Sequence, residues 1–485
     1  MNASVSRQAR SFGPLLDPAV GTALAALAAA VAVAPLATRS PTLAVVGVGG
    51  LALAGAVALH PPFAAFVLIA ATPLIVGIDR GSVIPILRPN EALALVLATG
   101  LCARLAGEII AGKPFRPRFS RVDAAILALA VTGSVLPLLW MHARGADITQ
   151  DDILYGLTLW KYYGLYLIVR ASVRSVRDVE ICLWLSLGAA ALVAVVAILQ
   201  ALQVFGVADL LATYYAPLGR EQALHDMRGT STIAAPQAVA DVMTFNLAIA
   251  AGLVLRGSPR RTGLFALSLL LVFGALASGQ FSGVLALVVG VVAFGYVTRR
   301  LTTTVLAFVP AAIVAAVALR PVVERRIAGF DTAAGIPPSW VGRIENLQTY
   351  FLPELSNGWN ILLGVRPAAR VAAPIESGRE WIFIESGYLW LVWSGGIALV
   401  LAFIFFLWTA IRRIASVARA RGDAVGVAAV ASFTALVVVA VLQAFDPHLT
   451  LRGAADLCFF LLALSLAGFT DADEPARVEA RPDSQ

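Results

Sequence analysis

Long apolar runs occupy more than half of this chain and constrain its fold more than any other feature. About fourteen of them approach the ~20 residues that a helix needs to cross ~30 Å of hydrocarbon. Only 13% of the residues are charged, which is too few to cover a water-facing surface. The alternating pattern of a membrane β-barrel is missing, and continuous runs such as Leu264–Ala277 satisfy their backbone only as helices. We therefore expect an all-α polytopic membrane protein.

One transmembrane domain is expected over residues 1–485, with about 14 transmembrane helices. The expected spans are Val20–Leu36, Leu43–Leu59, Phe63–Gly77, Glu91–Leu105, Val122–Met141, Ile153–Ile168, Glu180–Leu202, Pro236–Leu255, Gly263–Ala277, Gly283–Tyr296, Val305–Leu319, Tyr388–Ala410, Val425–Leu442 and Ala454–Gly468. An alternative holds for the first span: two arginines, an Ala-rich run and Ala-Pro-Leu-Ala also fit a cleaved signal peptide, which would leave thirteen.

Basic residues predict the orientation of these spans. With the N-terminus inside, twenty Lys and Arg residues fall on inside segments and seven on short outside connections. This bias obeys the positive-inside rule and predicts that both termini lie in the cytoplasm. Residues 471–485 are acidic and contain proline, and we expect them to be a disordered cytoplasmic tail.

Several functional classes find little support in the composition. The three cysteines stand alone, without CxxC spacing, which gives no basis for disulfides or zinc. Asp151 and Asp152 are adjacent rather than spaced to chelate a cation, so we expect no metal and no cofactor. The net charge of +7 comes from short arginine clusters between spans, which predicts no nucleic-acid partner, and no Walker loop is present.

Two outside connections, residues 205–235 and 320–381, are long enough to carry function. In the second, which lies between spans 11 and 12, Pro337-Pro338-Ser339 predicts a helix start and Pro353 a stop. Apolar residues recur there at helical spacing and predict an interfacial amphipathic helix: Ile344, Leu347, Phe351 and Leu355. A neighbouring polar face would hold Arg343, Asn346 and Tyr350.

Three outer segments carry side chains suited to chemistry. Glu385 lies among Trp and Tyr residues at the headgroup level. Its environment there can shift the pKa of the carboxylate and suit it to act as a general base; the alternative is a structural ion pair with a loop arginine. Arg228 precedes Pro236 at a helix start, where it fits an anion-binding pocket or headgroup snorkelling. His448 lies near Asp446 and Arg452, and it could titrate or bond a sugar hydroxyl, although a turn explains Asp446-Pro447 equally well.

Lys161 falls near the middle of the sixth expected span. An ionisable group at that depth costs at least ~2.5 kcal/mol on insertion scales, so it is a functional candidate that faces the bundle interior. The alternative is a misplaced span boundary, with the lysine snorkelling to one face of the membrane.

Three segments, in order, resemble the superfamily of O-antigen ligases and O-antigen polymerases of bacterial envelopes. Residues 228–238 are similar to its Arg, Gly and Pro before a span, and residues 279–283 to its break between paired spans, with Gln280-Phe281 in place of Ser-Arg. Residues 339–364 and 385–396 resemble its loop helix with an arginine, its Leu-Gly-Val turn and its Tyr-Leu helix. Ligases are expected to carry His-Asn where this chain has Glu385-Ser386, and an acidic residue there resembles a polymerase.

The resemblance implies a multi-span, GT-C-like glycosyltransferase that is metal-independent and inverting. It implies a polyprenyl-pyrophosphate-linked glycan as donor and acceptor, membrane lipids and a chain-length regulator as further partners, and an extracytoplasmic active site. Arg228 and Arg343 would stabilise the leaving pyrophosphate, and Glu385 would be the base. Side chains that would hold lipid phosphate or sugar are Lys161, Arg366, Arg370, Tyr388, His448 and Arg452. The alternatives are a ligase, or a lipid-linked sugar flippase, which Lys161 favours.

Overall fold

The computed structural model describes residues 41–81, 87–112, 119–215, 228–322, 324, 338–373 and 381–467. The helical bundle comprises α2 (Pro41–Leu59), α3 (Pro62–Ile75), α4 (Pro89–Ile110), α5 (Arg121–Thr132), α6 (Val135–Ala143), α7 (Gln150–Ser172), α8 (Val176–Ala201), α10 (Pro236–Leu255), α11 (Arg261–Ala277), α12 (Phe281–Thr298), α13 (Leu301–Ala318), α18 (Gly387–Ala420), α19 (Ala424–Leu442) and α20 (Ala454–Ser465). The connections contain α9 (Val207–Tyr214), η2 (Ser231–Ile233), α15 (Pro338–Asn346), η3 (Leu347–Phe351), α16 (Leu352–Leu355), α17 (Asn360–Leu363), β1 (Arg370–Ala372), β2 (Trp381–Phe383) and η5 (His448–Thr450).

The helices agree with the expected spans from the second onward, and the chain is an all-α polytopic membrane protein. Within the described residues, eight helices are long and apolar enough to cross a membrane, and four more are apolar but shorter. Helix α7, which carries Lys161, is not among these twelve. The first expected span, the signal-peptide alternative and the tail at residues 471–485 lie outside the described residues.

Helices α7 and α8 begin where side chains accept hydrogen bonds from backbone N–H groups that have no partner within the helix. Thr149 and Asp152 bond each other's backbone N–H groups at the start of α7, which satisfies two donors that the first turn leaves free. Ser175 and Asp178 do the same at α8. Pro236 occupies the first turn of α10, as its position in the sequence predicted, because that turn needs no N–H from it.

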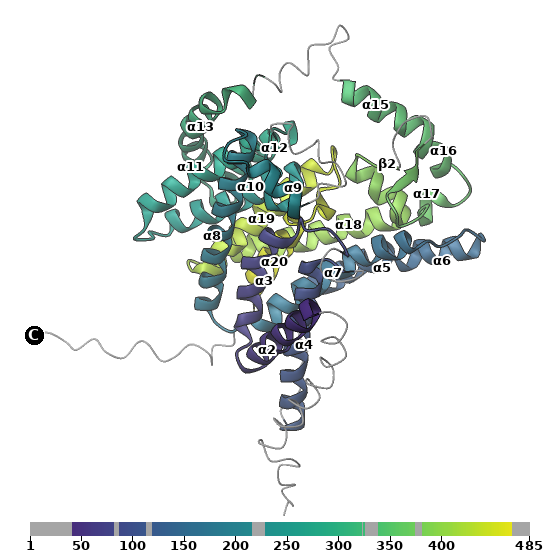
Figure 1. The fold of residues 1–485 in the computed structure, drawn as a ribbon, viewed down its shortest axis with the longest axis horizontal. Coiled ribbons are helices and arrows are strands. Elements are labelled where there is room, and N and C mark those ends of the chain that lie inside the picture. Colours follow the sequence, from purple (N-terminus) through teal and green to yellow (C-terminus); the bar gives the residue numbers. More distant parts are fainter. Residues whose placement is uncertain are drawn as a thin grey trace, which may run out of the picture.

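Helices α10 and α19 form the buried centre of the bundle, whereas α4 and α13 lie at its periphery. Small residues let the central helices approach closely: a Cβ atom at Gly252 would lie 2.9 Å from Val427, and one at Gly290 would lie 2.4 Å from Thr244. Figure 1 shows α15, α16, α17 and β2 gathered beside α6 at one side of the molecule, with α8 and α11 at the other.

The expected span Val122–Met141 is divided into α5 and α6 at Gly133-Ser134. A Cβ atom at Gly133 would lie 2.8 Å from the end of the Leu159 side chain of α7, which would have to move to admit a larger residue. The Ser134 hydroxyl accepts a hydrogen bond of 2.9 Å from the Trp160 indole. The bend therefore directs α6 toward the large connection that follows α13.

The expected amphipathic helix is present, but Pro353 does not end it. The chain remains helical from α15 through α16 because η3 is a π turn, in which Leu352 N–H bonds the carbonyl of Leu347 five residues earlier. This wider turn accommodates a proline ring that an ordinary α-turn would exclude. Phe351 and Leu355 are buried, whereas Ile344 is half exposed, so the apolar face is buried only toward the end of the helix.

The large connection docks into a break in α18. Gly396 has φ +66° there, which is outside the helical range, and the Val365 N–H donates a 2.6 Å hydrogen bond to the carbonyl of Trp393. In an unbroken helix that carbonyl would accept from residue 397. The Trp393 indole in turn donates to the carbonyl of Ala368. The break therefore exchanges one helical hydrogen bond for a loop contact that fixes residues 365–368 against α18.

Replacing Gly396 with alanine is expected to destabilise the protein by about 3 kcal/mol, since positive φ disfavours a side chain and overpacking adds to the cost. A Cβ atom there would lie 2.2 Å from the backbone of Leu362. Thermal unfolding of the purified protein in detergent measures the loss. Gly188→Ala in α8 is the matched control, because no atom lies within 4 Å of the new Cβ and helix propensity favours alanine. Equal unfolding temperatures for the two variants would contradict the role of Gly396.

Candidate functional site

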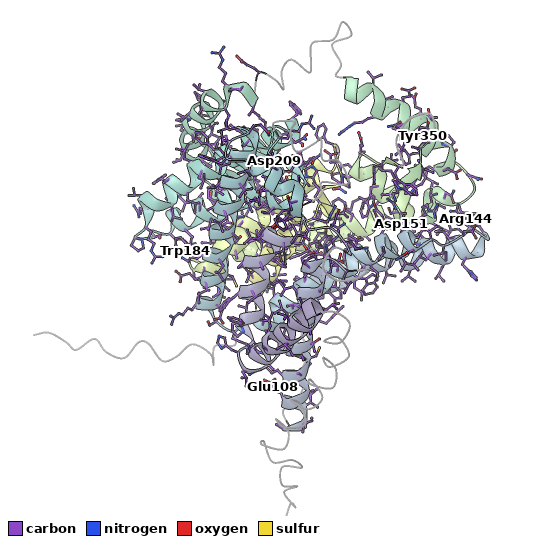
Figure 2. The ribbon with its side chains drawn as sticks, viewed as in Figure 1. Glu108, Arg144, Asp151, Trp184, Asp209 and Tyr350 are labelled. Carbon is purple, nitrogen blue, oxygen red and sulfur yellow. The ribbon has the colours of Figure 1, made fainter. Side chains whose placement is uncertain are left out.

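Two ion pairs connect the large connection to the start of α7. The Arg366 guanidinium donates two hydrogen bonds, of 2.9 and 2.6 Å, to the buried carboxylate of Asp152. Arg370 pairs with Asp151 and lies 4.0 Å from the centre of the Trp381 ring. Figure 2 labels Asp151 and Tyr350 on the same side of the molecule, which is consistent with these contacts. The two arginines expected to bind substrate thus hold the connection in place.

Arg144, at the end of α6, makes a third connection to the same segment. It donates 2.8 Å to the side-chain oxygen of Asn360 and 2.6 Å to the carbonyl of Val365. Trp140 donates to the same Asn360 oxygen at 2.8 Å. With the break in α18, these bonds fix the segment that leads through β1 and β2, which pair as antiparallel strands, to Glu385.

Arg343 of α15 lies at the centre of the candidate site, between two carboxylates. Its Nε forms an ion pair with Glu385, which immediately precedes α18, and its Nη2 lies 3.5 Å from Oδ1 of Asp446 in the connection between α19 and α20. Its Nη1 donates to the carbonyl of Phe445 at 3.1 Å. The Arg343 side chain is 32% exposed and that of Glu385 44%, so both are open to a ligand. Asp446 is 14% exposed.

A close approach between α18 and the end of α19 fixes the relation of the two carboxylates. A Cβ atom at Gly387 would lie 2.3 Å from the Gln443 side chain, so a larger residue there would displace Gln443. Tyr388 N–H donates to the Gln443 carbonyl at 3.1 Å, and the Gln443 side-chain oxygen accepts from Leu449 N–H at 3.0 Å. Gln443 therefore joins the start of α18 to the connection that holds Asp446 and His448.

Beneath this cluster lies a buried pair of His448 and Asp241. His448 Nδ1 is 2.6 Å from the carboxylate of Asp241 in α10, and both side chains are almost fully buried. Burial disfavours the imidazolium, but the charge and hydrogen bond of Asp241 outweigh it and raise the pKa of His448. Nε2 of His448 and Oδ1 of Asp241 have no hydrogen-bond partner among the described residues. The pair therefore supports the cluster from below with a group that can carry positive charge.

Burial raises the pKa of Asp446 to about 6, although Arg343 and His448 both favour its charged form. Glu385 and Asp241 add to the increase in pKa through their negative charges. Asp446 therefore changes its charge near neutral pH, at a point 3.5 Å from the arginine of the site. The charge available to an anionic ligand at Arg343 thus depends on pH.

Arg228 lies apart from these contacts within the described part of the chain. Its neighbour Gly229 donates to the carbonyl of Ala277 at the end of α11, and the following Ser231 donates to Gln200 at the end of α8. The turn that follows it reaches the α19–α20 connection, because a Cβ atom at Gly453 would lie 3.1 Å from Ile233. The Arg228 guanidinium makes no hydrogen bond or ion pair with another described residue, so its convergence on Arg343 stays a prediction.

Three further residues expected at the site, Lys161, Tyr388 and Arg452, lie in different environments. Lys161 faces the bundle interior, with its Nζ 3.6 Å from the fully buried Asp456 of α20. The Tyr388 hydroxyl donates to the carbonyl of Ala440 at 2.6 Å, and Arg452 is partly exposed in the turn before α20. Lys161 is thus neutralised by a partner, and its expected role in substrate binding stays a prediction.

Sequence reasoning missed two acidic residues of the cluster, Asp446 and Asp241. Turn chemistry explains Asp446 equally well from the sequence, because Asp-Pro is common in turns. Asp241 carried a usable signal: an ionisable side chain inside an expected span is a functional candidate by default. The same rule that identified Lys161 would have identified Asp241.

Replacing Asp446 with asparagine is expected to remove a pH dependence of stability. Because its pKa is about 6 in the folded protein, the folded state keeps a proton between about pH 4 and 6 that the unfolded chain has released. Stability therefore falls as pH rises through this window, by up to about 3 kcal/mol relative to Asp446→Asn. Unfolding in detergent between pH 4 and 7 measures it, with the exposed Asp147→Asn as control. Parallel pH profiles for wild type and Asp446→Asn would contradict the buried carboxyl.

Comparison with known proteins adds no identity to this geometry. No protein-family model, curated protein or solved structure matches the chain. The interpretation of the site therefore depends on its residues and on the resemblance described for the sequence.

Proposed function

We propose that this chain is a glycosyltransferase that polymerises polyprenyl-pyrophosphate-linked oligosaccharide units at the outer face of the cytoplasmic membrane. The reaction is inverting and metal-independent, and it serves the synthesis of a cell-surface glycan such as an exopolysaccharide, a capsule or an O-antigen. One observation carries the proposal: an arginine of the large connection contacts a partly exposed carboxylate at the start of a transmembrane helix.

The Arg343 contacts suit a diphosphate ligand. A guanidinium has five N–H donors, and the described contacts to Glu385, Asp446 and the Phe445 carbonyl engage three of its directions. The remaining donors can hold phosphate oxygens, which guanidinium groups bind through paired hydrogen bonds. Guanidinium N–H donors held in place at that position stabilise the negative charge that develops on a leaving pyrophosphate.

The chemical step is a single displacement. The acceptor hydroxyl oxygen bonds to the anomeric carbon of the donor sugar while the bond from that carbon to the pyrophosphate oxygen breaks. The hydroxyl proton passes to Glu385, and the lipid pyrophosphate leaves with the electron pair. Attack on the face opposite the leaving group inverts the anomeric configuration. Arg228 is the second cation of the proposal and approaches the pyrophosphate from the connection that precedes α10.

Two carboxylates compete for the role of base, and exposure favours Glu385. Its side chain is 44% exposed, against 14% for Asp446, so an acceptor sugar reaches it more readily. Asp446 instead positions Arg343 from the other side, supported by the pair of His448 and Asp241 beneath it. The proposal thus separates a proton acceptor from a positioning acid.

The flippase alternative needs charged groups that are free to accompany a substrate through the bundle. Lys161, which favoured it, is paired with Asp456, and Asp456 also caps α20 through the Gly453 N–H. This arrangement favours a structural role for the lysine. The ligase alternative uses the same donor chemistry, and the products of the reaction distinguish it from a polymerase.

Arg343→Gln, Arg228→Gln and Glu385→Gln are each expected to lower polymer formation at least about a hundredfold while the protein stays inserted and folded. Single lipid-linked repeats should accumulate on the outer leaflet. Gel analysis of glycan made from purified lipid-linked repeat by the reconstituted protein measures polymer length. Glu345→Gln is the matched control, because this exposed acid lies two residues from Arg343 on the same helix.

Other results would redirect the proposal. Full-length polymer from all three variants would refute the catalytic assignment. Repeats that accumulate on the inner leaflet would identify a flippase, and long chains that remain unattached would identify a ligase. If Asp446→Asn abolished turnover while Glu385→Gln retained it, Asp446 would be the base instead of Glu385.

A further inference from the structure

A second basic site lies at the opposite end of the bundle from the Arg343 cluster. A cleft of about 310 Å³ opens there between the ends of α10, α12 and α18, lined by Arg256, Arg299 and Arg419 together with Thr298. Its volume far exceeds the ~15 Å³ that a single water requires. Helix α10 separates the two ends by its length: Asp241 of the first cluster lies in its second turn, and Arg256 follows its last residue. The site therefore takes no part in the proposed chemistry.

Arg256 is held at the wall of this cleft by contacts with Arg421 and Asp423. It donates 2.8 Å to the carbonyl of Arg421, and its Nη1 lies 4.0 Å from Asp423. A Cβ atom at Gly426 would lie 2.3 Å from Nη2 of Arg256, so the absence of a side chain there makes room for the guanidinium. Arg421 pairs with Asp423 more closely, at 2.5 Å. Asp423 is thus already engaged by Arg421, and no acid among the described residues lines the cleft, which leaves it positively charged.

Arg299 occupies a backbone position that glycine would normally take. It follows the last residue of α12 with φ +57° and ψ +33°, and the next N–H, of Arg300, bonds the Gly295 carbonyl at 2.8 Å. This is the helix-ending turn in which glycine is strongly favoured, because a side chain costs about 1 kcal/mol or more there. An arginine at this strained position suggests a function that offsets the cost.

The residues around the cleft are of the kinds that occur at a membrane surface. Tyr296, one turn before Arg299, is 64% exposed and stacks on Phe433. Exposed tyrosines at the end of apolar helices mark the headgroup level. Figure 2 labels Trp184 on the opposite side of the molecule from Tyr350. The guanidinium of Arg260, which lies in the connection between α10 and α11, is 5.3 Å from the centre of the Trp184 ring. Arginines and aromatic rings thus meet at this end as they do at a membrane boundary.

We propose that this cleft binds the phosphate of an anionic phospholipid headgroup. Three guanidinium groups around one hollow provide paired donors for phosphate oxygens, and basic pockets between transmembrane helices bind anionic headgroups in this way. The bound lipid connects the ends of α10, α12 and α18 and stabilises the bundle. The proposal is independent of the proposed catalytic function.

The test measures thermal unfolding of the full chain in neutral detergent during titration with short-chain phosphatidylglycerol. Phosphatidylcholine and inorganic phosphate serve as the comparison ligands. Phosphatidylglycerol is expected to raise the unfolding temperature in a saturable manner. Arg299→Gly and Arg419→Gln should each raise its half-saturating concentration about tenfold, since each removes a charge-assisted hydrogen bond.

Arg299→Gly is the sharper variant, because glycine relieves the positive φ and should not lower stability in the absence of lipid. Arg300→Gln, one residue away and not lining the cleft, is the matched control and should keep the wild-type response. An unchanged half-saturating concentration in both Arg299→Gly and Arg419→Gln would overturn the site. Equal responses to phosphatidylglycerol and phosphatidylcholine would overturn the preference for anionic lipid. An equal response to inorganic phosphate would identify a free-anion site instead.

Discussion

The break in α18 is the constraint on which the candidate site depends. A transmembrane helix normally satisfies all its backbone groups internally, since lipid offers no partners. Here the Trp393 carbonyl accepts a hydrogen bond from the Val365 N–H, and glycine at position 396 admits the backbone of the large connection at Leu362. The connection therefore becomes part of the helix packing. From this fixed point the chain runs through β1 and β2 to Glu385, whose position is determined by backbone bonds on both sides.

The site contains two groups of charged side chains, one near the surface and one buried beneath it. Near the surface, Arg343 is shared by Glu385 and Asp446, so its charge is more than neutralised when both acids are ionised. Below, His448 and Asp241 form an almost fully buried pair. Removing one member of a buried pair leaves the other uncompensated, which costs more than the pair contributes. The four charged side chains around Arg343 consequently act as one electrostatic unit, although they come from separate segments of the chain.

The all-α membrane class was predictable from the sequence, because a helix that crosses hydrocarbon needs a long run of apolar residues, and such runs are visible along the chain. The sequence also predicted the neighbourhood of Arg343 and Glu385, because an amphipathic loop helix and an aromatic-flanked carboxylate carry local signals. Partnerships were not predictable. Arg366 with Asp152, and Lys161 with Asp456, join residues hundreds of positions apart, and nothing local distinguishes a paired arginine from one that awaits a ligand. Whether Arg228 reaches the same ligand remains a prediction for the same reason.

The π turn between α15 and α16 affects how this segment can change during evolution. One extra residue in a helix rotates everything before it by about 100° relative to everything after it. Phe351 and Leu355 pack inward on one side of the turn, while Arg343 is directed toward Glu385 on the other. Deleting a single residue from Leu347–Phe351 would yield a more regular helix, yet it would turn Arg343 away from its carboxylates. We therefore expect Leu347–Phe351 to tolerate substitutions better than a change in its length.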